Sequence, residues 1–443
     1  MKYHIITFGC QINKSDSERI AGTLEKIGYK SALDIQRADL IVVNMCSVRQ
    51  SAVDRVYGLA PKFKKLKTKN YKLKTVLTGC ILKTDFKKFQ RDFDIILSIK
   101  TLPYWKDILK KKTAYYYPDS RNKRTIKKLE LDYLKIEPEY ICNFSAYIPI
   151  ITGCNNFCAY CVVPYVRGSE ICRPTNEILK EIKQLVKNNI KEIWLLGSNV
   201  NSYLYKNIDF AELLKRADKI PGNFWINFAS SHPNDFSNKL IKTIIKCKKV
   251  SKYISLPIQS GDNEILLKMN RPYTVEDYIK IIKKIKKEIP NVFLSTDIIV
   301  GFPGETKKQF ENTAKLLKKI KFDMAYIAEY SPRTGTSAFK MKNNVSDKEK
   351  HKRREILTEI LKKTSTLNSK KHIGKIFDVL IHQITKKGDL VGKTPFYRTV
   401  KITHHKDCPP GELKNLVGKI VKVKIIDSTP WGLCAEVARA LRP

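Results

Sequence analysis

The sequence predicts an α/β protein of 443 residues with three parts and one linker. Strand-like and helix-like segments alternate over residues 1–113 and again over 140–370, and such alternation predicts mostly parallel sheets. Residues 371–443 carry short alternating runs split by Gly, Pro and Asp, which are typical of a small antiparallel β-barrel. Residues 114–139 have little apolar period and are expected to be a linker, with room for a strand or short helix of its own.

In the N-terminal part, three apolar strand candidates each end in a cysteine. These residues are Cys10, Cys46 and Cys80, called here the N-terminal triad, and they lie 36 and 34 positions apart. Ligands of parallel sheets collect at the carboxyl ends of the strands, so the three thiols are expected to converge. The alternative is that each is a separate core cysteine.

The central part contains six strand candidates, centred near residues 150, 194, 226, 255, 296 and 326. The intervals of 29 to 44 residues each hold a segment of helical period. Six βα units would form an incomplete version of the eight-unit TIM barrel, in which the chemistry lies on the loops after the strands. Polar side chains follow these strands, among them Ser198, Asn199, His232, Gln259 and Asp297. His232 is either a base or a satisfied structural histidine.

The loop after the first central strand carries Cys154, Cys158 and Cys161, called here the loop triad. This C-x3-C-x2-C spacing lets one loop provide thiolates to three irons of a cubane, whose usual complement is four cysteines. The fourth iron would stay open for a substrate or cofactor. Zinc sites usually draw four ligands in paired spacings, and no His or fourth Cys follows at such a spacing. A zinc knuckle and three unrelated cysteines are the alternatives. The N-terminal triad would hold a second cluster with an open iron.

The composition of the chain bears on its partner and on its location in the cell. Lys and Arg number 84 against 43 Asp and Glu, and the net charge of +41 favours a polyanionic partner. Biased base composition is the alternative, because lysine dominates and is spread over every segment. Eleven cysteines in such a chain favour reduced, metal-binding thiols. No apolar run approaches 18 residues and the first residues lack a signal-peptide pattern, so a soluble, cytoplasmic protein that contacts no membrane is expected.

The C-terminal part has strand candidates at 376–384, 399–403, 418–426 and 433–437, after a basic helical stretch at 348–371. Its lysines and arginines could contact phosphates, and Phe396, Tyr397 and Trp431 could stack on bases or belong to the core. The residues expected to bind RNA are Lys393, Arg398, Lys401 and Lys406, together with Arg333 at the mouth of the central barrel.

Several motifs resemble the methylthiotransferases, a family of radical SAM enzymes. They include TFGCQINKSDSE around Cys10, NMCSVRQSA around Cys46, ITGCNNFCAYCVVPYVRGSEICRP, DIIVGFPGET and YSPRTGTSA. The resemblance covers essentially the full length, including a terminal segment similar to a TRAM RNA-binding barrel, and is closest to the MiaB-type tRNA enzymes. One departure is visible, because this chain reads Gly197-Ser198-Asn199 where that type usually carries Gly-Gln-Asn.

The resemblance implies two [4Fe-4S] clusters and S-adenosylmethionine (SAM) as cofactors. It implies that SAM is cleaved reductively at the loop triad, that the cluster on the N-terminal triad holds the sulfur to be inserted, and that a second SAM supplies the methyl group. The residues expected near SAM are Tyr160, Ser198, Asn199, Gln259 and Asp297. The remaining cysteines are expected only to pack, namely Cys142, Cys172, Cys247, Cys408 and Cys434.

The implied substrate is N6-isopentenyladenosine at position 37 of tRNA, next to the anticodon. A basic terminal barrel suits tRNA better than a cationic ribosomal protein. An apolar N6 tail suits an apolar pocket, whereas a threonylcarbamoyl tail would need a fixed cation, for which Arg333 is a candidate. The alternatives are threonylcarbamoyladenosine in tRNA, an aspartate of a small-subunit ribosomal protein, and a non-catalytic iron–sulfur protein that binds RNA. The expected partners are tRNA and sulfur and electron donors of unknown identity, and a monomer is expected.

Overall fold

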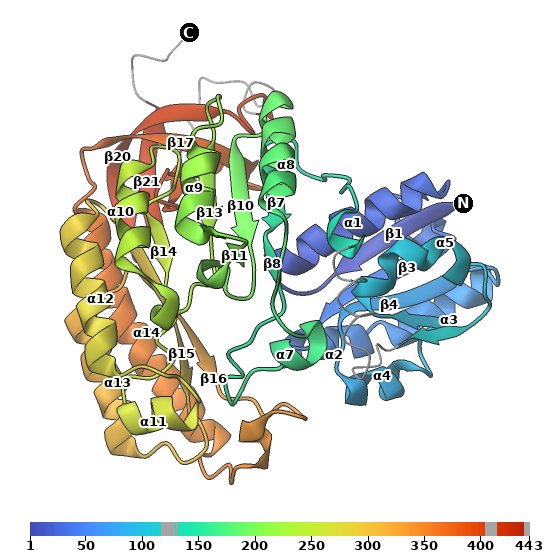
Figure 1. Cartoon of the computed structure of the whole chain (residues 1–443), viewed down its shortest axis with the longest axis horizontal. Helices are drawn as coiled ribbons and strands as arrows, with labels where there is room; N and C mark the ends of the chain where they lie inside the picture. The colour runs from blue at the N-terminus through green and yellow to red at the C-terminus, as the bar shows by residue number, and fades with distance from the viewer. Residues whose placement is uncertain (117–128, 130–131, 404–413, 438–443) are drawn as a thin grey trace.

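The computed structural model describes residues 1–116, 129, 132–403 and 414–437. Its parts follow the predicted order: an N-terminal α/β domain, a central partial barrel and a C-terminal β-barrel (Figure 1). Within the described residues, no helix is long and apolar enough to cross a membrane.

The N-terminal domain is a six-stranded sheet with the order β2-β1-β3-β4-β5-β6, and all neighbouring strands are parallel. Side chains of a strand alternate between its faces, so β3 places Val42 in one hydrophobic cluster and Val43 in another. The strands are β1 (Lys2–Thr7), β2 (Lys30–Ser31), β3 (Leu40–Cys46), β4 (Lys74–Cys80), β5 (Ile95–Leu97) and β6 (Ala114–Tyr116). The helices are α1 (Gln11–Lys26), α2 (Gln50–Tyr57), α3 (Ala60–Lys69), α4 (Lys83–Phe89) and α5 (Trp105–Ile108), with 3₁₀ turns at Ile35–Arg37 and Ile99–Tyr104.

The segment expected to be a linker contributes to this domain at both ends. Strand β6 pairs with β5, so the sheet continues three residues past position 113. Tyr133 and Leu134 are buried in the same hydrophobic cluster as Tyr3 of β1. The segment is therefore partly packed against the sheet.

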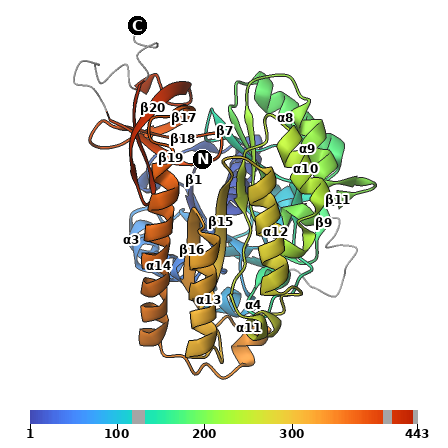
Figure 2. The ribbon, with the colours of Figure 1, turned by 90° about the vertical axis from the view of Figure 1, so that its left-hand side faces the viewer.

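The central domain contains the six predicted parallel strands. They form two three-stranded sheets, with β7, β10 and β13 in one and β14, β15 and β16 in the other, joined by a parallel bridge between Ile226 and Val250. Helices cover the outside of the strands (Figure 2). The strands are β7 (Ser145–Pro149), β10 (Glu192–Leu196), β13 (Trp225–Phe228), β14 (Tyr253–Ser255), β15 (Phe293–Val300) and β16 (Met324–Glu329). The helices are α8 (Thr175–Lys187), α9 (Phe210–Asp218), α10 (Asn238–Lys246), α11 (Asn263–Lys268), α12 (Val275–Glu288), α13 (Lys307–Ile320) and α14 (Asp347–Lys370).

Short elements complete the loops of this domain. They are α7 (Val163–Arg167), the strand pairs β8 (Ile151–Thr152) with β9 (Ile171–Cys172) and β11 (Leu204–Tyr205) with β12 (Ile208–Asp209), and 3₁₀ turns at Val200–Ser202, Pro233–Asp235 and Ser337–Lys340. The first central strand was expected to lead directly to Cys154. It ends instead at Pro149, and the antiparallel β8–β9 pair then closes a loop of residues 153–170 that holds all three cysteines.

Five strands close the C-terminal barrel in the order β17-β18-β19-β21-β20. They are β17 (Ile376–Ile384), β18 (Leu390–Lys393), β19 (Thr399–Ile402), β20 (Ile420–Thr429) and β21 (Gly432–Val437). The barrel was predicted to be antiparallel, and all its pairs are antiparallel except β19 with β21. Strand β18 was not among the predicted strands.

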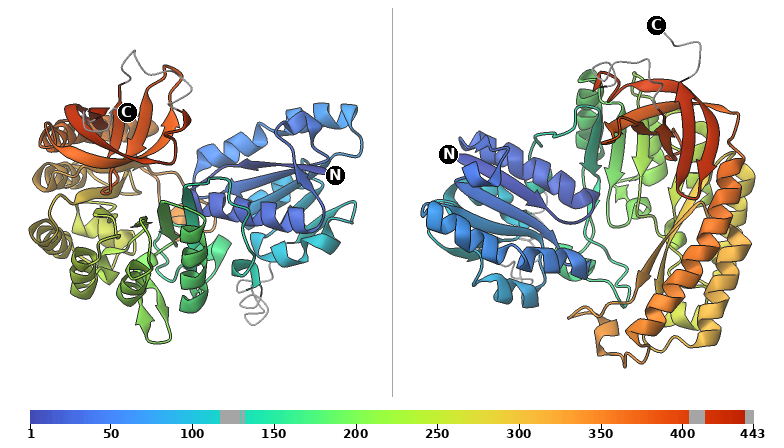
Figure 3. Two further views of the ribbon diagram at one scale, coloured as in Figure 1. Left: turned by 90° about the horizontal axis from the view of Figure 1, so that it is seen from above. Right: turned by 180° about the vertical axis from the view of Figure 1, so that it is seen from behind.

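The C-terminal barrel covers the end of the central domain where the parallel strands begin. Arg398 forms an ion pair with Asp323, which precedes β16, and Ser251, which precedes β14, donates to the carbonyl of Pro395 at 2.7 Å. The views from above and behind show the N-terminal domain beside the central domain and the C-terminal barrel on its upper end (Figure 3). The loops that follow the central strands lie at the opposite end, so RNA bound by the barrel would have to reach around the domain.

Candidate functional site

The N-terminal triad converges at the carboxyl edge of its sheet, where parallel strands end together. The register of β3 and β4 places Cys46 opposite Cys80. Cys10 ends the turn after β1, and a Cβ atom on the preceding Gly9 would lie 2.9 Å from the Cβ of Cys46. Asn13 accepts a hydrogen bond from the Cys10 thiol at 3.5 Å and donates to the carbonyl of Met45 at 3.0 Å. The three cysteines therefore lie at one edge of the sheet, and their role as cluster ligands stays a prediction.

These thiols are buried and influence one another. Burial raises the pKa of Cys80 to about 12, with Arg167 acting against the shift and the thiols of Cys46 and Cys10 adding to it. Burial and the neighbouring Cys10 raise the pKa of Cys46. A thiolate forms at such a site when positive charge compensates it, as a bound metal would.

The loop triad lies on the central domain, in the loop between β8 and β9. Gly153 has φ +75°, and a Cβ atom there would lie 2.0 Å from the carbonyl oxygen of Ser169, so only glycine fits this turn. The Ala159 amide donates to the carbonyl of Met269 at 2.9 Å, and its own carbonyl accepts from the Ala338 amide at 2.8 Å. Burial raises the pKa of Cys161 to about 12, and the other two thiols of the triad add to the shift.

A buried arginine lies against one sulfur of each triad. Among the described residues, no group of three His, Cys, Asp or Glu side chains is placed to hold a metal ion. Each triad has one sulfur that accepts from such an arginine: Arg167 Nε donates to Cys80 Sγ at 3.0 Å, and Arg271 Nη1 donates to Cys158 Sγ at 3.3 Å. Such donors favour the thiolate form that binds iron.

Arg271 is fixed from three sides and lies next to Tyr160. Its other nitrogens donate to the hydroxyl of Tyr273 at 2.7 Å and to the carbonyl of Pro257 at 3.1 Å. Tyr160 packs against a small cluster that contains Met269 and Phe302. The expected SAM contact at Tyr160 stays a prediction, although the ring lies beside the loop triad.

Polar atoms without a hydrogen-bond partner lie after the ends of β10 and β13, where a ligand could form hydrogen bonds with them. Among the described residues, Asn199 Oδ1, Ser231 Oγ and His232 Nε2 are buried without a hydrogen-bond partner. Buried polar groups normally have one, so these atoms suit a polar ligand such as SAM. Asn199 is held in place by a hydrogen bond of 2.7 Å to Asp235, and Ser198 beside it is half-buried. The expected SAM contacts at Ser198 and Asn199 stay predictions.

His232 is neutral in this environment. Burial and the nearby Arg271 lower the pKa of His232 to about 3. Its Nδ1 accepts from the Asn234 amide at 3.2 Å, so the unpartnered Nε2 carries the proton and can only donate. Of the two expected roles, the Nδ1 hydrogen bond fits a structural histidine rather than a base, although Nε2 has no partner among the described residues.

Asp297 lies on β15 of the central domain and interacts with Arg49 of the N-terminal domain. Burial raises the pKa of its carboxyl to about 6, and the guanidinium groups of Arg49 and Arg271 oppose the shift. Arg49 lies three residues after Cys46 and is exposed. Gln259, on the neighbouring loop, has φ +73°, and its amide donates to the Asp297 carbonyl at 2.9 Å. Asp297 and Arg49 thus approach each other from the sides of the two triads.

The residues expected to bind RNA lie in different environments. Lys401 is exposed and pairs with Asp389 at 2.9 Å, and Lys406 lies outside the described residues. Lys393 is half-buried over the ring of Tyr397, and burial lowers its pKa to about 8.

Two of these residues are buried at domain interfaces. Arg398 is 5% exposed and is paired with Asp323. Arg333 is 6% exposed and donates to the side chain of Gln50 and to the carbonyl of Val48 at 3.2 Å. In this arrangement both arginines are buried and join domains, and the expectation that they bind RNA stays a prediction.

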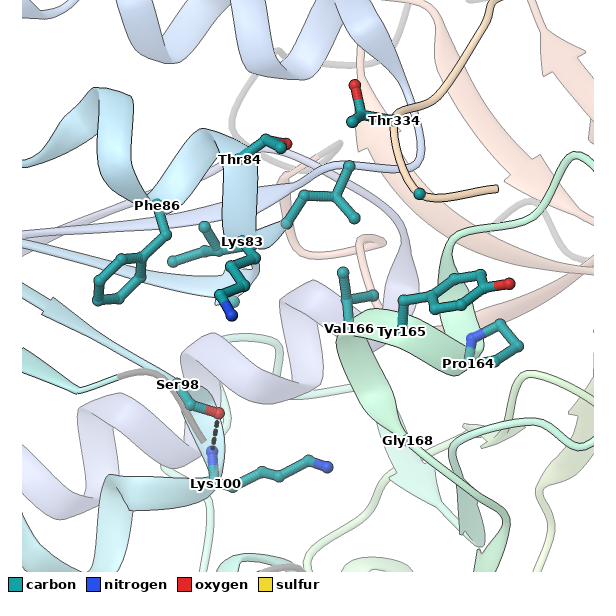
Figure 4. A pocket seen from close by; sticks show the side chains of 14 residues that line it. Lys83, Thr84, Phe86, Ser98, Lys100, Pro164, Tyr165, Val166, Gly168 and Thr334 are labelled. Carbon is teal, nitrogen blue, oxygen red and sulfur yellow. Dashed lines mark hydrogen bonds between the residues drawn. The ribbon is translucent and has the colours of Figure 1, made fainter. Parts of the chain in front are cut away.

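A hollow of about 400 Å³ lies behind the end of β4, between α4 and α7. Its lining includes Lys83, Phe86, Tyr165, Val166 and Thr334 (Figure 4). Lys100 borders it and donates to the carbonyl of Arg167 at 3.0 Å. The neighbouring residues of α7 thus line the hollow, whereas the Arg167 side chain contacts Cys80.

Sequence reasoning did not single out the charged residues around the triads. Arg167 and Arg271 stand in the quoted PYVRGSE stretch and in NRPY, and Asp16 stands within TFGCQINKSDSE. Their place within or beside the motifs that carry Gly, Pro and Cys is the signal that could have found them. Their partners lie 87, 113 and 151 positions away in the chain, which no local pattern reveals.

Family models match each of the three parts. The model described as uncharacterized protein family UPF0004 matches residues 2–99, the radical SAM superfamily matches 148–317, and the TRAM domain matches 370–438.

The fold also resembles solved structures at low sequence identity. The radical SAM methyltransferase TsrM from Kitasatospora setae, with cobalamin and a [4Fe-4S] cluster bound, matches with a TM-score of 0.56 at 12% identity, over 76% of this chain and 77% of that one. The cobalamin-dependent enzyme OxsB matches with a TM-score of 0.53 at 12% identity, over 81% of this chain and 56% of that one. At this identity the likeness describes the fold alone.

Curated relatives extend over nearly the whole chain. The tRNA-2-methylthio-N(6)-dimethylallyladenosine synthase of Clostridium botulinum strain Hall is 41% identical, over 98% of this chain and 96% of its own. The enzymes of the same name from Clostridium tetani and Caldicellulosiruptor saccharolyticus are 40% and 39% identical, each over 98% of this chain. The chain therefore belongs to the radical SAM tRNA methylthiotransferases, in the family of the tRNA-2-methylthio-N(6)-dimethylallyladenosine synthases.

Proposed function

We propose that this protein converts N6-dimethylallyladenosine (isopentenyladenosine) at position 37 of tRNA into its 2-methylthio derivative. The observation that carries the proposal is that two cysteine triads lie on adjoining domains, linked by the Arg167–Cys80 hydrogen bond, in a chain 41% identical to enzymes named for this product. One triad can serve SAM and the other can hold sulfur, and the adenine ring would bind between them.

The protein's own residues would bind and orient the reactants. The loop triad and the N-terminal triad would each provide three thiolates to a [4Fe-4S] cluster. Arg271 would stabilise a thiolate of the loop triad, and Arg167 would stabilise one of the N-terminal triad. When bound, the clusters and SAM supply the radical and sulfur chemistry that no side chain can perform. The unpartnered atoms of Asn199, Ser231 and His232 would meet the polar groups of SAM.

The substrate base would bind near Asp297 and Arg49, which carry opposite charges and interact. Tyr326, which pairs in register with Asp297 on β16, is 52% exposed. A flat aromatic ring at that place can stack on a base. Arg333, which could have met the carboxylate of a threonylcarbamoyl tail, is buried against Val48 and Gln50. The relatives named for the dimethylallyl product favour the dimethylallyl tail over the threonylcarbamoyl one.

The test offers the reconstituted protein three substrates with SAM and a reductant under anaerobic conditions. They are tRNA carrying dimethylallyladenosine, tRNA carrying threonylcarbamoyladenosine, and small ribosomal subunits. Mass spectrometry of nucleosides and of ribosomal proteins should find the methylthio group on dimethylallyladenosine alone. Product on threonylcarbamoyladenosine alone, or on a ribosomal protein alone, would overturn the proposed substrate.

A further inference from the structure

One arginine crosses from the loop triad's segment to the N-terminal triad. Arg167 is the last residue of α7, six positions after Cys161. Its Nε donates to Cys80 Sγ at 3.0 Å, and its Nη2 forms an ion pair with Asp16 Oδ2 at 2.7 Å. Tyr133 donates its hydroxyl to the other oxygen of Asp16. We call Arg167, Asp16 and Tyr133 the arginine link.

The arginine link is removed from solvent and is balanced in charge. Arg167, Asp16 and Tyr133 are 5%, 0% and 3% exposed. A buried guanidinium is costly unless it is paired, and its planar fork can hold two acceptors at fixed angles. Here the acceptors are the Asp16 carboxylate and the Cys80 sulfur. This pairing places one positive charge directly against a sulfur of the N-terminal triad.

The same link connects three elements that carry the two triads. Asp16 lies on α1, which begins directly after Cys10, and Cys80 ends β4. Arg167 ends the helix that follows the loop triad. A shift of α7 would therefore be transmitted to two of the three cysteines of the N-terminal triad.

We propose that Arg167 is a positioning residue that fixes the two triads relative to each other and stabilises the reduced form of the cluster on the N-terminal triad. Reduction by one electron adds one negative charge, and a charge-assisted hydrogen bond to a ligand sulfur favours that state. The inference rests on the proposed function only in that the N-terminal triad holds a cluster. It requires neither tRNA nor SAM.

Substitutions at the two charged ends of the link should act in opposite directions. Arg167→Met removes the donor and leaves Asp16 buried, so the reduction potential should fall. We expect the ratio of reduced to oxidised cluster at a fixed potential to fall about tenfold, which equals about 59 mV for a one-electron couple. Asp16→Asn keeps the donor but removes its counter-charge, so the potential should rise. Arg167→Lys keeps the positive charge but cannot donate to two acceptors at fixed angles. It should therefore lower the reduction potential less than Arg167→Met does.

The measurement uses full-length protein in which Cys154, Cys158 and Cys161 are all alanine, so that only the cluster on the N-terminal triad remains. Iron analysis should give about four irons per chain in this background. A potentiometric titration followed by electron paramagnetic resonance then reports the potential of that cluster. The background is compared with the same protein carrying each change at Arg167 or Asp16.

Arg173→Met provides the matched control. Arg173 is 7% exposed and pairs with Glu181, yet it contacts no cysteine of either triad among the described residues. The Arg173→Met variant should have lower thermal stability and an unchanged reduction potential of the cluster. An unchanged potential in Arg167→Met, shifts of the same sign in Arg167→Met and Asp16→Asn, or an equal shift in Arg173→Met would overturn the proposal. If Arg167→Met does not load iron, Arg167→Lys and Asp16→Asn still carry the test of opposite signs.

A second measurement examines the positioning role in protein with both clusters. Arg167→Lys should retain cleavage of SAM to 5′-deoxyadenosine and yield less methylthio product for each SAM cleaved, whereas Arg173→Met should keep the wild-type ratio. An unchanged ratio in Arg167→Lys would contradict the positioning role. Because the titration contains no tRNA, a failure of the proposed substrate leaves its result intact.

Discussion

At the scale of single residues, the cysteines could be predicted from the sequence and their charged neighbours could not. The loop triad is local, since Cys154 and Cys161 are seven positions apart, so the grouping of its three thiols can be predicted from spacing alone. The N-terminal triad was predictable because each cysteine ends an apolar run. Arg167 and Arg271 meet their cysteine partners only through tertiary packing, 87 and 113 positions away. Likewise, the burial of Arg333 and Arg398 depends on domain contacts that a local pattern does not contain.

Asp297 yields a prediction on pH dependence. Burial raises its pKa from 3.8 to about 6 in the folded protein. The folded state therefore binds this proton more tightly than the unfolded state, and stability is lost as pH rises from about 4 to about 6. Asp297→Asn removes this loss, so the variant should be more stable than the wild type at pH 7.5. The stability difference should be smaller at pH 5 by about 1–2 kcal/mol.

Thermal unfolding of cofactor-free protein at the two pH values measures this difference. A stability difference that is the same at pH 5 and pH 7.5 would show that Asp297 does not titrate in this range. A variant less stable than the wild type at both pH values would show that the carboxylate is a net stabilising group.

At the scale of elements, periodicity predicted the long strands and missed the short ones. Strand β18 spans only Leu390–Lys393 and contains Gly392, which has no side chain to show alternation. The β8–β9 pair was missed because two-residue strands carry no period, although it is this pair that closes the loop around the cysteines. Strand β6 lies in a segment whose polar composition indicates a linker, and pairing with β5 overrides that local tendency.

The exposed lysines of the C-terminal barrel yield a prediction on RNA binding. Lys386, Lys387 and Lys401 are exposed, whereas Arg398 is buried at the domain contact. Replacing the three lysines with alanine should weaken tRNA binding, because fewer phosphates of the tRNA would be neutralised. The log–log salt slope should become shallower by about 0.7–0.9 for each phosphate that the barrel no longer binds.

The matched control is the triple alanine variant of Lys62, Lys64 and Lys65 on α3, which removes the same charge from the N-terminal domain. Binding measured by fluorescence anisotropy at several salt concentrations should change little for this control. Equal weakening in both triple variants would mean that net charge, rather than the barrel, attracts tRNA.

At the scale of the whole molecule, the order of the three parts could be predicted, but their arrangement could not. Strand–helix alternation indicates parallel sheets wherever it occurs, and these place ligands at the strand ends. Buried contacts between domains determine which strand ends of the two domains face each other. Examples are the ion pair of Arg167 with Asp16 and the hydrogen bond from Ser15 to the carbonyl of Tyr147. These contacts hold the domains that carry the two triads against each other, while the C-terminal barrel lies at the far end of the central strands.

The loop triad is assigned to SAM cleavage and the N-terminal triad to sulfur insertion, and one assay tests this assignment. Two variants are prepared in which the loop triad or the N-terminal triad is replaced by alanine. Each is reconstituted with iron and sulfide and incubated with SAM, a reductant and tRNA carrying dimethylallyladenosine. The same sample is then analysed by mass spectrometry for 5′-deoxyadenosine and for the methylthio nucleoside.

The loop-triad variant should form neither compound. The N-terminal-triad variant should form 5′-deoxyadenosine without the methylthio nucleoside, because SAM cleavage needs only the loop triad. Methylthio product from the N-terminal-triad variant, or continued SAM cleavage by the loop-triad variant, would contradict the assignment of the two sites.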